Sequence, residues 1–133
     1  MSKTTPRLEH AFLYVSDLGA TLAYYERLFP SWSVRWEGRS KQGNRWVHFG
    51  PPGEGQPGYL SLFELPGAKE VEEQVDAVYV AHIGFAHDDV SGMRARLAKQ
   101  HIYPSDEVEA DGYRRVYYAD PDGHQLEFVE QLA

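Results

Sequence analysis

The chain has 133 residues and a formal net charge of -7, from 13 Lys and Arg against 20 Asp and Glu. An acidic chain lacks the basic surface that collects phosphates, so we expect no nucleic-acid partner. Because the sequence has no cysteine, disulfides and thiolate chemistry are excluded, and His, Asp and Glu remain as the strong metal ligands. No signal peptide or bilayer-spanning segment is recognisable, so we expect a cytoplasmic protein with no membrane partner.

The first half of the chain predicts the element order βαβββ. Residues 8–15 alternate and are rich in apolar side chains, which indicates a strand, and Ser16-Asp17 offers an N-cap for a helix that runs to about Phe29. Pro30 ends this helix. Short strands are predicted at 34–36, 45–49 and 59–65, the last after a Gly/Pro-rich loop at 50–58.

The second half repeats this order. A charged stretch at 67–77 predicts a linker with a short helix. A strand at 78–86 follows, then Asp88-Asp89 as a cap for a helix over 90–100. The last three strands are predicted at 107–110, 113–119 and 125–131, with a turn at 120–123.

An internal duplication explains this repetition. His10 and His82 are 72 residues apart, and Asp17 and Asp89 have the same separation. We therefore interpret residues 1–133 as one α+β domain of two βαβββ modules, 7–66 and 78–131, joined by the linker 67–77. Glu64 and Glu127 are interpreted as equivalent residues in the last strands.

These four residues form a candidate metal site. His10 and His82 lie in the first strand of each module, and each ligand-type side chain interrupts an apolar strand. Strand alternation would place the flanking apolar residues on the helix-covered face and the ligands together on the other face. An unpaired buried carboxylate is costly, and a cation between the four side chains would remove that cost.

Three segments carry a resemblance to a known family: Arg7-Leu8-Glu9-His10, Ala81-His82-Ile83-Gly84-Phe85, and the run from Tyr118 to Phe128 with its Asp120-Pro121-Asp122-Gly123 turn. With them, nearly the whole chain resembles the vicinal oxygen chelate superfamily. This superfamily includes glyoxalase I, extradiol dioxygenases and the fosfomycin and bleomycin resistance proteins. The resemblance implies a curled sheet cup around a metal, often completed by dimerisation, so we expect a homodimer.

Within the superfamily, the His, Glu, His, Glu set is most similar to that of glyoxalase I. That resemblance implies nickel, zinc or cobalt held by His10, Glu64, His82 and Glu127. It also implies a lyase or isomerase that acts through an enediolate on a small vicinal-oxygen substrate, such as a 2-oxoaldehyde thiol adduct. Glu127 or Glu64 would move the proton. Candidate substrate contacts in the cup are Tyr14, Trp46, His48, Arg115 and Tyr118.

Two other functions stay open. An extradiol dioxygenase holds iron with two His and one carboxylate, and it requires Glu64 to turn away from the metal. A non-catalytic protein that binds an antibiotic or metabolite would hold no metal.

Overall fold

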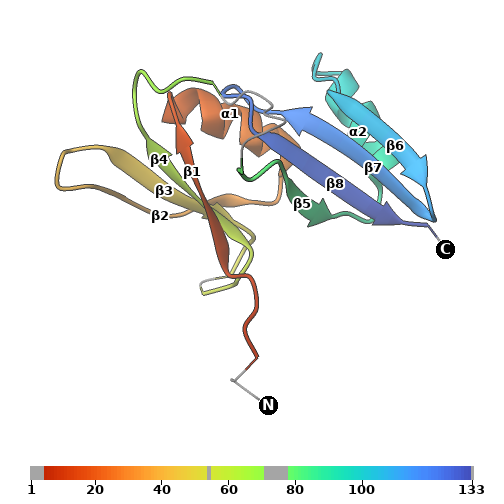
Figure 1. The fold of residues 1–133 in the computed structure, drawn as a ribbon, viewed down its shortest axis with the longest axis horizontal. Coiled ribbons are helices and arrows are strands. Elements are labelled where there is room, and N and C mark those ends of the chain that lie inside the picture. Colours follow the sequence, from red (N-terminus) through yellow and green to blue (C-terminus); the bar gives the residue numbers. More distant parts are fainter. Residues whose placement is uncertain (1–4, 54, 71–77, 133) are drawn as a thin grey trace. The chain divides into compact units, whose positions relative to one another are not determined.

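The computed structural model describes residues 5–53, 55–70 and 78–132. The chain divides into two compact units, residues 1–68 and 69–133 (Figure 1). The elements of the first unit are β1 (His10–Val15), α1 (Leu18–Leu28), β2 (Ser33–Arg39), β3 (Arg45–Gly50) and β4 (Tyr59–Glu64). Those of the second unit are β5 (Ile83–Ala86), α2 (Val90–Ala98), β6 (Asp106–Ala110), β7 (Tyr113–Ala119) and β8 (Gln125–Gln131).

Both units have the same sheet topology. The strand order is β1-β4-β3-β2 in the first and β5-β8-β7-β6 in the second. In each sheet the first and last strands of the unit pair in parallel, and the other neighbours pair antiparallel. A parallel pair needs a long crossover, which the helix and the intervening strands supply. The predicted α+β class and the repeated βαβββ order are therefore confirmed.

The helix starts are built alike in the two units. The side chain of Asp17 accepts a hydrogen bond from the N–H of Ala20 at 3.0 Å. The side chain of Asp89 accepts one from the N–H of Gly92 at 2.9 Å. Each carboxylate satisfies a backbone donor that the first turn of a helix leaves unpaired. The caps predicted at Ser16-Asp17 and Asp88-Asp89 are confirmed, and Asp17 and Asp89 are the capping residues.

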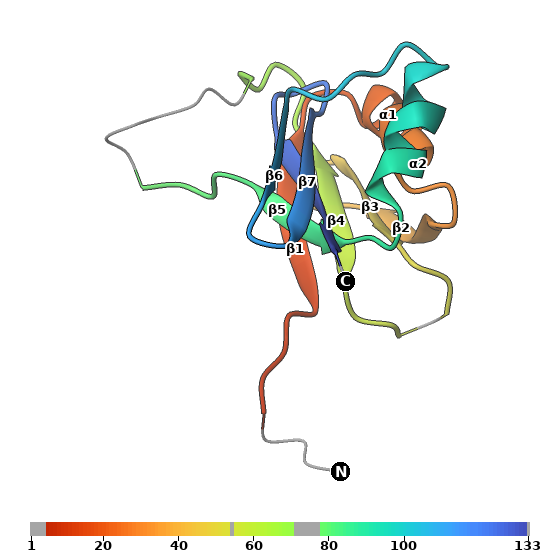
Figure 2. The same ribbon diagram turned by 90° about the vertical axis from the view of Figure 1, so that its right-hand side faces the viewer.

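One face of each sheet is covered by the helix of its unit, and Figure 2 shows α2 along one side of the second sheet. In the first unit, Tyr25 of α1 packs against Phe49 of β3 with ring centroids 6.2 Å apart. In the second unit, Tyr118 of β7 packs against Phe128 of β8. These aromatic side chains are buried. The opposite face of each sheet is called its open face below.

Two predicted strands differ from those of the structure. The strand expected over 78–86 spans only Ile83–Ala86, so His82 precedes the strand. The second strand of the first unit is longer than expected and contains a bulge between Val34 and Trp36. Part of the expected linker, 71–77, lies outside the described residues. Neither described helix has the length and apolarity that a bilayer crossing demands.

Candidate functional site

The open face of the second unit carries Glu127 at its centre. Glu127 of β8 lies opposite Gly84 of β5 and opposite Tyr117 of β7, and paired residues point to the same face of a sheet. Its neighbours Leu126 and Phe128 are buried on the helix-covered face. The alternation predicted around Glu127 is therefore confirmed.

His82 and Tyr117 surround the Glu127 carboxylate. The Nε2 atom of His82 lies 3.7 Å from Oε2 of Glu127, and the rings of His82 and Tyr117 meet edge to face at 5.8 Å. Glu127 is only 8% exposed. The Tyr117 hydroxyl donates a hydrogen bond to the Glu127 carboxylate, and this bond, followed by desolvation, raises the pKa of Tyr117 above its ordinary value. A buried carboxylate beside an imidazole is a donor set that suits zinc, iron or nickel.

Gly84 leaves space beside this carboxylate. A Cβ atom added at Gly84 would lie 3.5 Å from Oε1 of Glu127. The site therefore has room next to Glu127 for a small atom or ion.

We expect Tyr117→Phe to weaken metal binding while the fold is kept. Without its hydroxyl, nothing from Tyr117 orients the Glu127 carboxylate, and loss of such a supporting hydrogen bond typically costs roughly 10–100-fold in metal affinity. Competition with a chromogenic chelator measures the affinity. An unchanged affinity would mean that the hydroxyl does not orient the ligand.

Tyr118 does not belong to this site. It pairs with Leu126 on the helix-covered face, is fully buried and contacts Phe128. The expectation that it contacts substrate was wrong by one residue, because strand alternation gives the open face to Tyr117 instead. Arg115, two residues from Tyr117, shares the open face, where its guanidinium lies 4.9 Å from the Tyr113 ring centroid.

The open face of the first unit is rich in rings. Along β1 it presents His10, Phe12 and Tyr14, which pair with Tyr59, Ser61 and Phe63 of β4. The candidate substrate contacts Trp46 and His48 of β3 pair with Phe63 and Ser61 and so lie on the same face. Tyr14, Trp46 and His48 are therefore brought to one surface.

His10 lies at one end of this face. Its ring stacks on Tyr59 with centroids 5.1 Å apart, and its Nδ1 atom is 3.0 Å from the Glu9 carboxylate. No three His, Asp or Glu side chains within residues 5–53, 55–70 and 78–132 are arranged as a metal site. Of the four predicted ligands, His82 and Glu127 are brought together within one unit.

Glu64 points to the other face of its sheet. It pairs with Val15, a fully buried residue of the helix-covered face, and its Oε2 atom accepts the N–H of Leu18 at 2.8 Å. Leu18 is the first residue of α1. The expected equivalence of Glu64 and Glu127 was therefore wrong, because Glu64 holds a helix N-terminus, where a carboxylate is favoured by unpaired N–H groups and the helix dipole.

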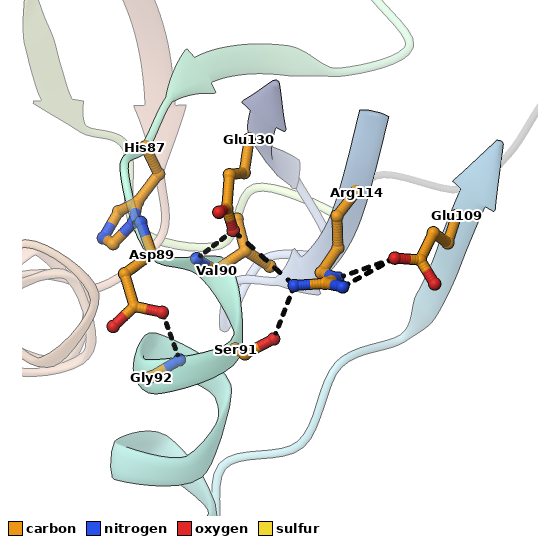
Figure 3. A network of polar contacts seen from close by, with 8 residues as sticks. All are labelled: His87, Asp89, Val90, Ser91, Gly92, Glu109, Arg114 and Glu130. Carbon is orange, nitrogen blue, oxygen red and sulfur yellow. Dashed lines mark hydrogen bonds and ion pairs between the residues drawn. The ribbon is translucent and has the colours of Figure 1, made fainter. Parts of the chain in front are cut away.

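The true counterpart of Glu64 is Glu130. Its Oε1 atom accepts the N–H of Val90, the first residue of α2, at 2.9 Å (Figure 3). Glu127 lies three residues before Glu130, and Ser61 lies three residues before Glu64, so Glu127 corresponds to Ser61. Ser61 pairs with Phe12 of β1 as Glu127 pairs with Gly84 of β5. The first unit thus carries a small hydroxyl where the second carries a carboxylate.

We expect Glu64→Ala and Glu130→Ala each to destabilise the protein by about 1 kcal/mol, the usual cost of removing a helix-capping side chain. The measurement is the urea concentration at half-unfolding. Equal losses in the two variants would support equivalent capping roles. If Glu64→Ala left the midpoint unchanged, the hydrogen bond to Leu18 would contribute nothing to stability.

His48 is an uncharged base candidate on the open face of the first unit. Desolvation, followed by the charges of His10 and Arg35, lowers the pKa of His48 below its ordinary value of 6.5. Its imidazole is therefore neutral at pH 7 and able to accept a proton.

Comparison with known proteins agrees with this architecture. The family model of the Glyoxalase/Bleomycin resistance protein/Dioxygenase superfamily matches residues 7–128. The chain belongs to this superfamily, which confirms the family expected from its motifs. No curated protein sequence matches the chain.

Several solved structures share the fold. One is a glyoxylase/bleomycin resistance protein/dioxygenase domain from Frankia sp. EAN1pec, with 21% identity, coverage of 96% of this chain and 93% of that chain, and a TM-score of 0.77. The trypanothione-dependent glyoxalase I of Leishmania major has 21% identity, and the match covers 95% of this chain and 87% of that chain with a TM-score of 0.76. The fosfomycin resistance protein FosX of Listeria monocytogenes, complexed with Mn(II) and sulfate, has 19% identity. The match covers 96% of this chain and 93% of that chain, with a TM-score of 0.66.

Proposed function

We propose that this protein is a metal-dependent enzyme that acts on a small substrate with two adjacent oxygen atoms. The observation that carries the proposal is the cluster of His82, Glu127 and Tyr117, in which a buried carboxylate lies beside an imidazole. The resemblance to the superfamily adds His10 of the first unit as a third ligand. When bound, the metal would supply Lewis-acid polarisation of the substrate oxygens.

Each residue of the chain has a separate task in this proposal. Glu127 and His82 bind the metal, and Tyr117 orients Glu127 through its hydrogen bond. For a glyoxalase I-type lyase or isomerase, a base must move a proton between adjacent carbons. Glu64 accepts the Leu18 N–H on the other face, and Glu127 is already used as a metal ligand in this proposal. We therefore propose His48, whose pKa is lowered by desolvation, for the proton transfer in place of the two glutamates.

A second reaction is favoured by the position of Glu64. Since Glu64 faces away from His10 and Phe12, the candidate ligands reduce to two His and one carboxylate. Such a set is typical of Fe(II) oxygenases, which keep positions open for a chelating substrate and for oxygen. We therefore keep an extradiol-type dioxygenase as the second candidate. The superfamily resemblance also supports a homodimer.

One experiment separates these functions. Chelator-treated protein is loaded in turn with Ni(II), Zn(II), Co(II), Mn(II) and Fe(II), and each form is tested for conversion of methylglyoxal thiol adducts and for oxygen uptake with catechol. Turnover of the adducts without oxygen uptake supports the isomerase. Oxygen uptake with Fe(II) alone supports the dioxygenase, and failure to retain any metal contradicts both.

The proposed role of His48 as the base of an isomerase predicts how activity depends on pH. A base whose pKa is lowered stays neutral to lower pH, so we expect activity to persist below pH 6.5 and to fall only as His48 becomes protonated. His48→Gln should abolish the turnover that depends on this base while leaving bound metal unchanged. Full activity in His48→Gln would remove His48 from the mechanism. The measurement is the pH dependence of kcat for both proteins.

A further inference from the structure

The turn between β6 and β7 consists of two residues, Asp111 and Gly112. The two strands close on the pair of Ala110 and Tyr113, so only these two residues lie outside the ladder. Both have positive φ, 54° for Asp111 and 80° for Gly112. This combination is that of the type I′ hairpin turn, for which Asp-Gly is a preferred sequence. The residue that follows the Asp111 carboxyl group therefore has no side chain to hinder it.

The two groups of this dipeptide that can react with each other are not engaged elsewhere. Within the described part of the chain, the Asp111 carboxylate has neither a hydrogen bond nor an ion pair, and the Gly112 N–H has no acceptor. When the Gly112 nitrogen turns toward the side chain of Asp111, no hydrogen bond of that nitrogen has to break. The turn thus leaves an electrophilic carboxyl carbon next to an unhindered backbone nitrogen.

We propose that Asp111 is a site of spontaneous isoaspartate formation, with water as the only other reactant. The Gly112 nitrogen attacks Cγ of Asp111, and the carboxyl hydroxyl leaves as water with the proton of the Gly112 N–H. Water then opens the resulting succinimide ring. Addition at one ring carbonyl restores aspartate, whereas addition at the other leaves the main chain running through Cγ. The isoaspartate product has the same composition as the original residue.

The chain contains a second Asp-Gly sequence, Asp122-Gly123, whose nitrogen is engaged. The Gly123 N–H donates to the Asp120 carbonyl at 2.9 Å, and the Asp122 N–H donates to the Asp120 carboxylate at 2.9 Å. Turning the Gly123 nitrogen toward the Asp122 carboxyl group would break the first of these bonds. The two Asp-Gly sequences therefore differ in reactivity within one folded chain, and the second is an internal control for the first.

An isoaspartate in the turn adds one methylene group to the backbone between β6 and β7. The length of a hairpin turn fixes the register of its two strands. The Gly112 carbonyl accepts the N–H of Leu132 at 2.8 Å, which holds Gly112 to the end of β8, whereas β6 is the outermost strand of its sheet and pairs only with β7. The added group therefore shifts β6. It also displaces Glu109, whose carboxylate lies 2.6 Å from Arg114 (Figure 3).

The test is storage of the intact protein at neutral pH and physiological temperature, followed by digestion with trypsin. Cleavage after Lys and Arg places Asp111 in a peptide of residues 100–114 and Asp122 in a peptide of residues 116–133. A protein isoaspartate methyltransferase with a labelled methyl donor marks isoaspartate, and electron-transfer fragmentation locates it. A second sample is stored in urea, which removes the fold.

We expect isoaspartate at Asp111 to accumulate over several weeks to several times its level at Asp122. In urea, where neither turn is held, the two sites should react at similar rates. Asp111→Glu should abolish the signal in the 100–114 peptide, because a glutamate would have to close a larger and less favourable ring. Asp111→Asn also suits the turn and should form isoaspartate faster, because ammonia leaves an amide more readily than water leaves a carboxylate.

Hydrogen exchange of the separated isoaspartate form tests the shift of β6. Its backbone N–H groups should exchange faster than in the unmodified protein, while those of β8 keep their protection. Equal exchange of β6 in the two forms would contradict the loss of register. Equal isoaspartate at Asp111 and Asp122 in the folded protein, or isoaspartate at Asp106 in place of Asp111, would overturn the proposal. Isoaspartate that forms only in urea would also overturn it, because the closed turn would then protect Asp111.

Discussion

Replacing Glu127 with Gln is expected to remove bound metal and abolish activity. The amide keeps the size of the side chain but loses its charge, and a cation held by few ligands depends strongly on a carboxylate. His82→Ala should have the same effect, because it removes the imidazole 3.7 Å from that carboxylate. The metal content of the purified proteins, measured by plasma mass spectrometry, should fall from about one metal ion per chain to nearly none.

Glu64→Gln is the informative control for this prediction. Because Glu64 accepts the Leu18 N–H on the helix-covered face, its amide variant should keep the full metal content. Loss of metal in Glu64→Gln, with the fold intact by circular dichroism, would restore the four-ligand set and contradict the assignment of Glu64 to the helix. If the Glu127→Gln variant kept its metal, the metal would not be bound by the cluster of His82, Glu127 and Tyr117.

Tyr118→Ala is expected to lower the free energy of unfolding by about 3–5 kcal/mol, the usual cost of removing a large aromatic side chain from a core. Tyr118 is fully buried against Phe128. Since whole domains are stable by only about 5–15 kcal/mol, this variant should lose a large share of its free energy of unfolding. Urea unfolding followed by tryptophan fluorescence measures the loss.

The neighbouring variants separate core from site. Tyr118→Phe should be neutral or stabilising, because the Tyr118 hydroxyl is buried and has no hydrogen-bond partner among the described residues. Tyr117→Ala should cost less stability than Tyr118→Ala, since Tyr117 lies on the open face. If Tyr117→Ala were the more destabilising of the two, the side chains of β7 would point the other way.

The repeated fold could be predicted from the sequence because its signals are local. Asp17 and Asp89 each precede a helical pattern, and turn residues such as Gly123 mark where a strand begins; in the structure Asp120 accepts the N–H groups of Asp122 and His124 just before β8. Such signals depend on residues a few positions apart. The strands β7 and β8 accordingly have the predicted bounds.

The roles of the glutamates could not be predicted in the same way. Alternation identifies a face only when one face is apolar, and in β4 both faces are: Leu62 is buried under the helix, while Phe63 lies on the open face. The partner of Glu64, the N–H of Leu18, is 46 residues away in sequence. The pattern around Glu127 was clearer because its two neighbours in sequence, Leu126 and Phe128, are both apolar and are buried on the helix-covered face.

The last strand of each unit is also a central strand of its sheet. β4 lies between β1 and β3, and β8 lies between β5 and β7. During synthesis, a nascent chain that ends at Gly58 contains the segments of β1, α1, β2 and β3 but lacks β4, the strand that joins β1 to the rest of the sheet. The carboxylate that caps α1 arrives with that same strand, at Glu64. We therefore expect the first unit to fold in one late step, once β4 leaves the ribosome, and to tolerate no truncation before Glu64.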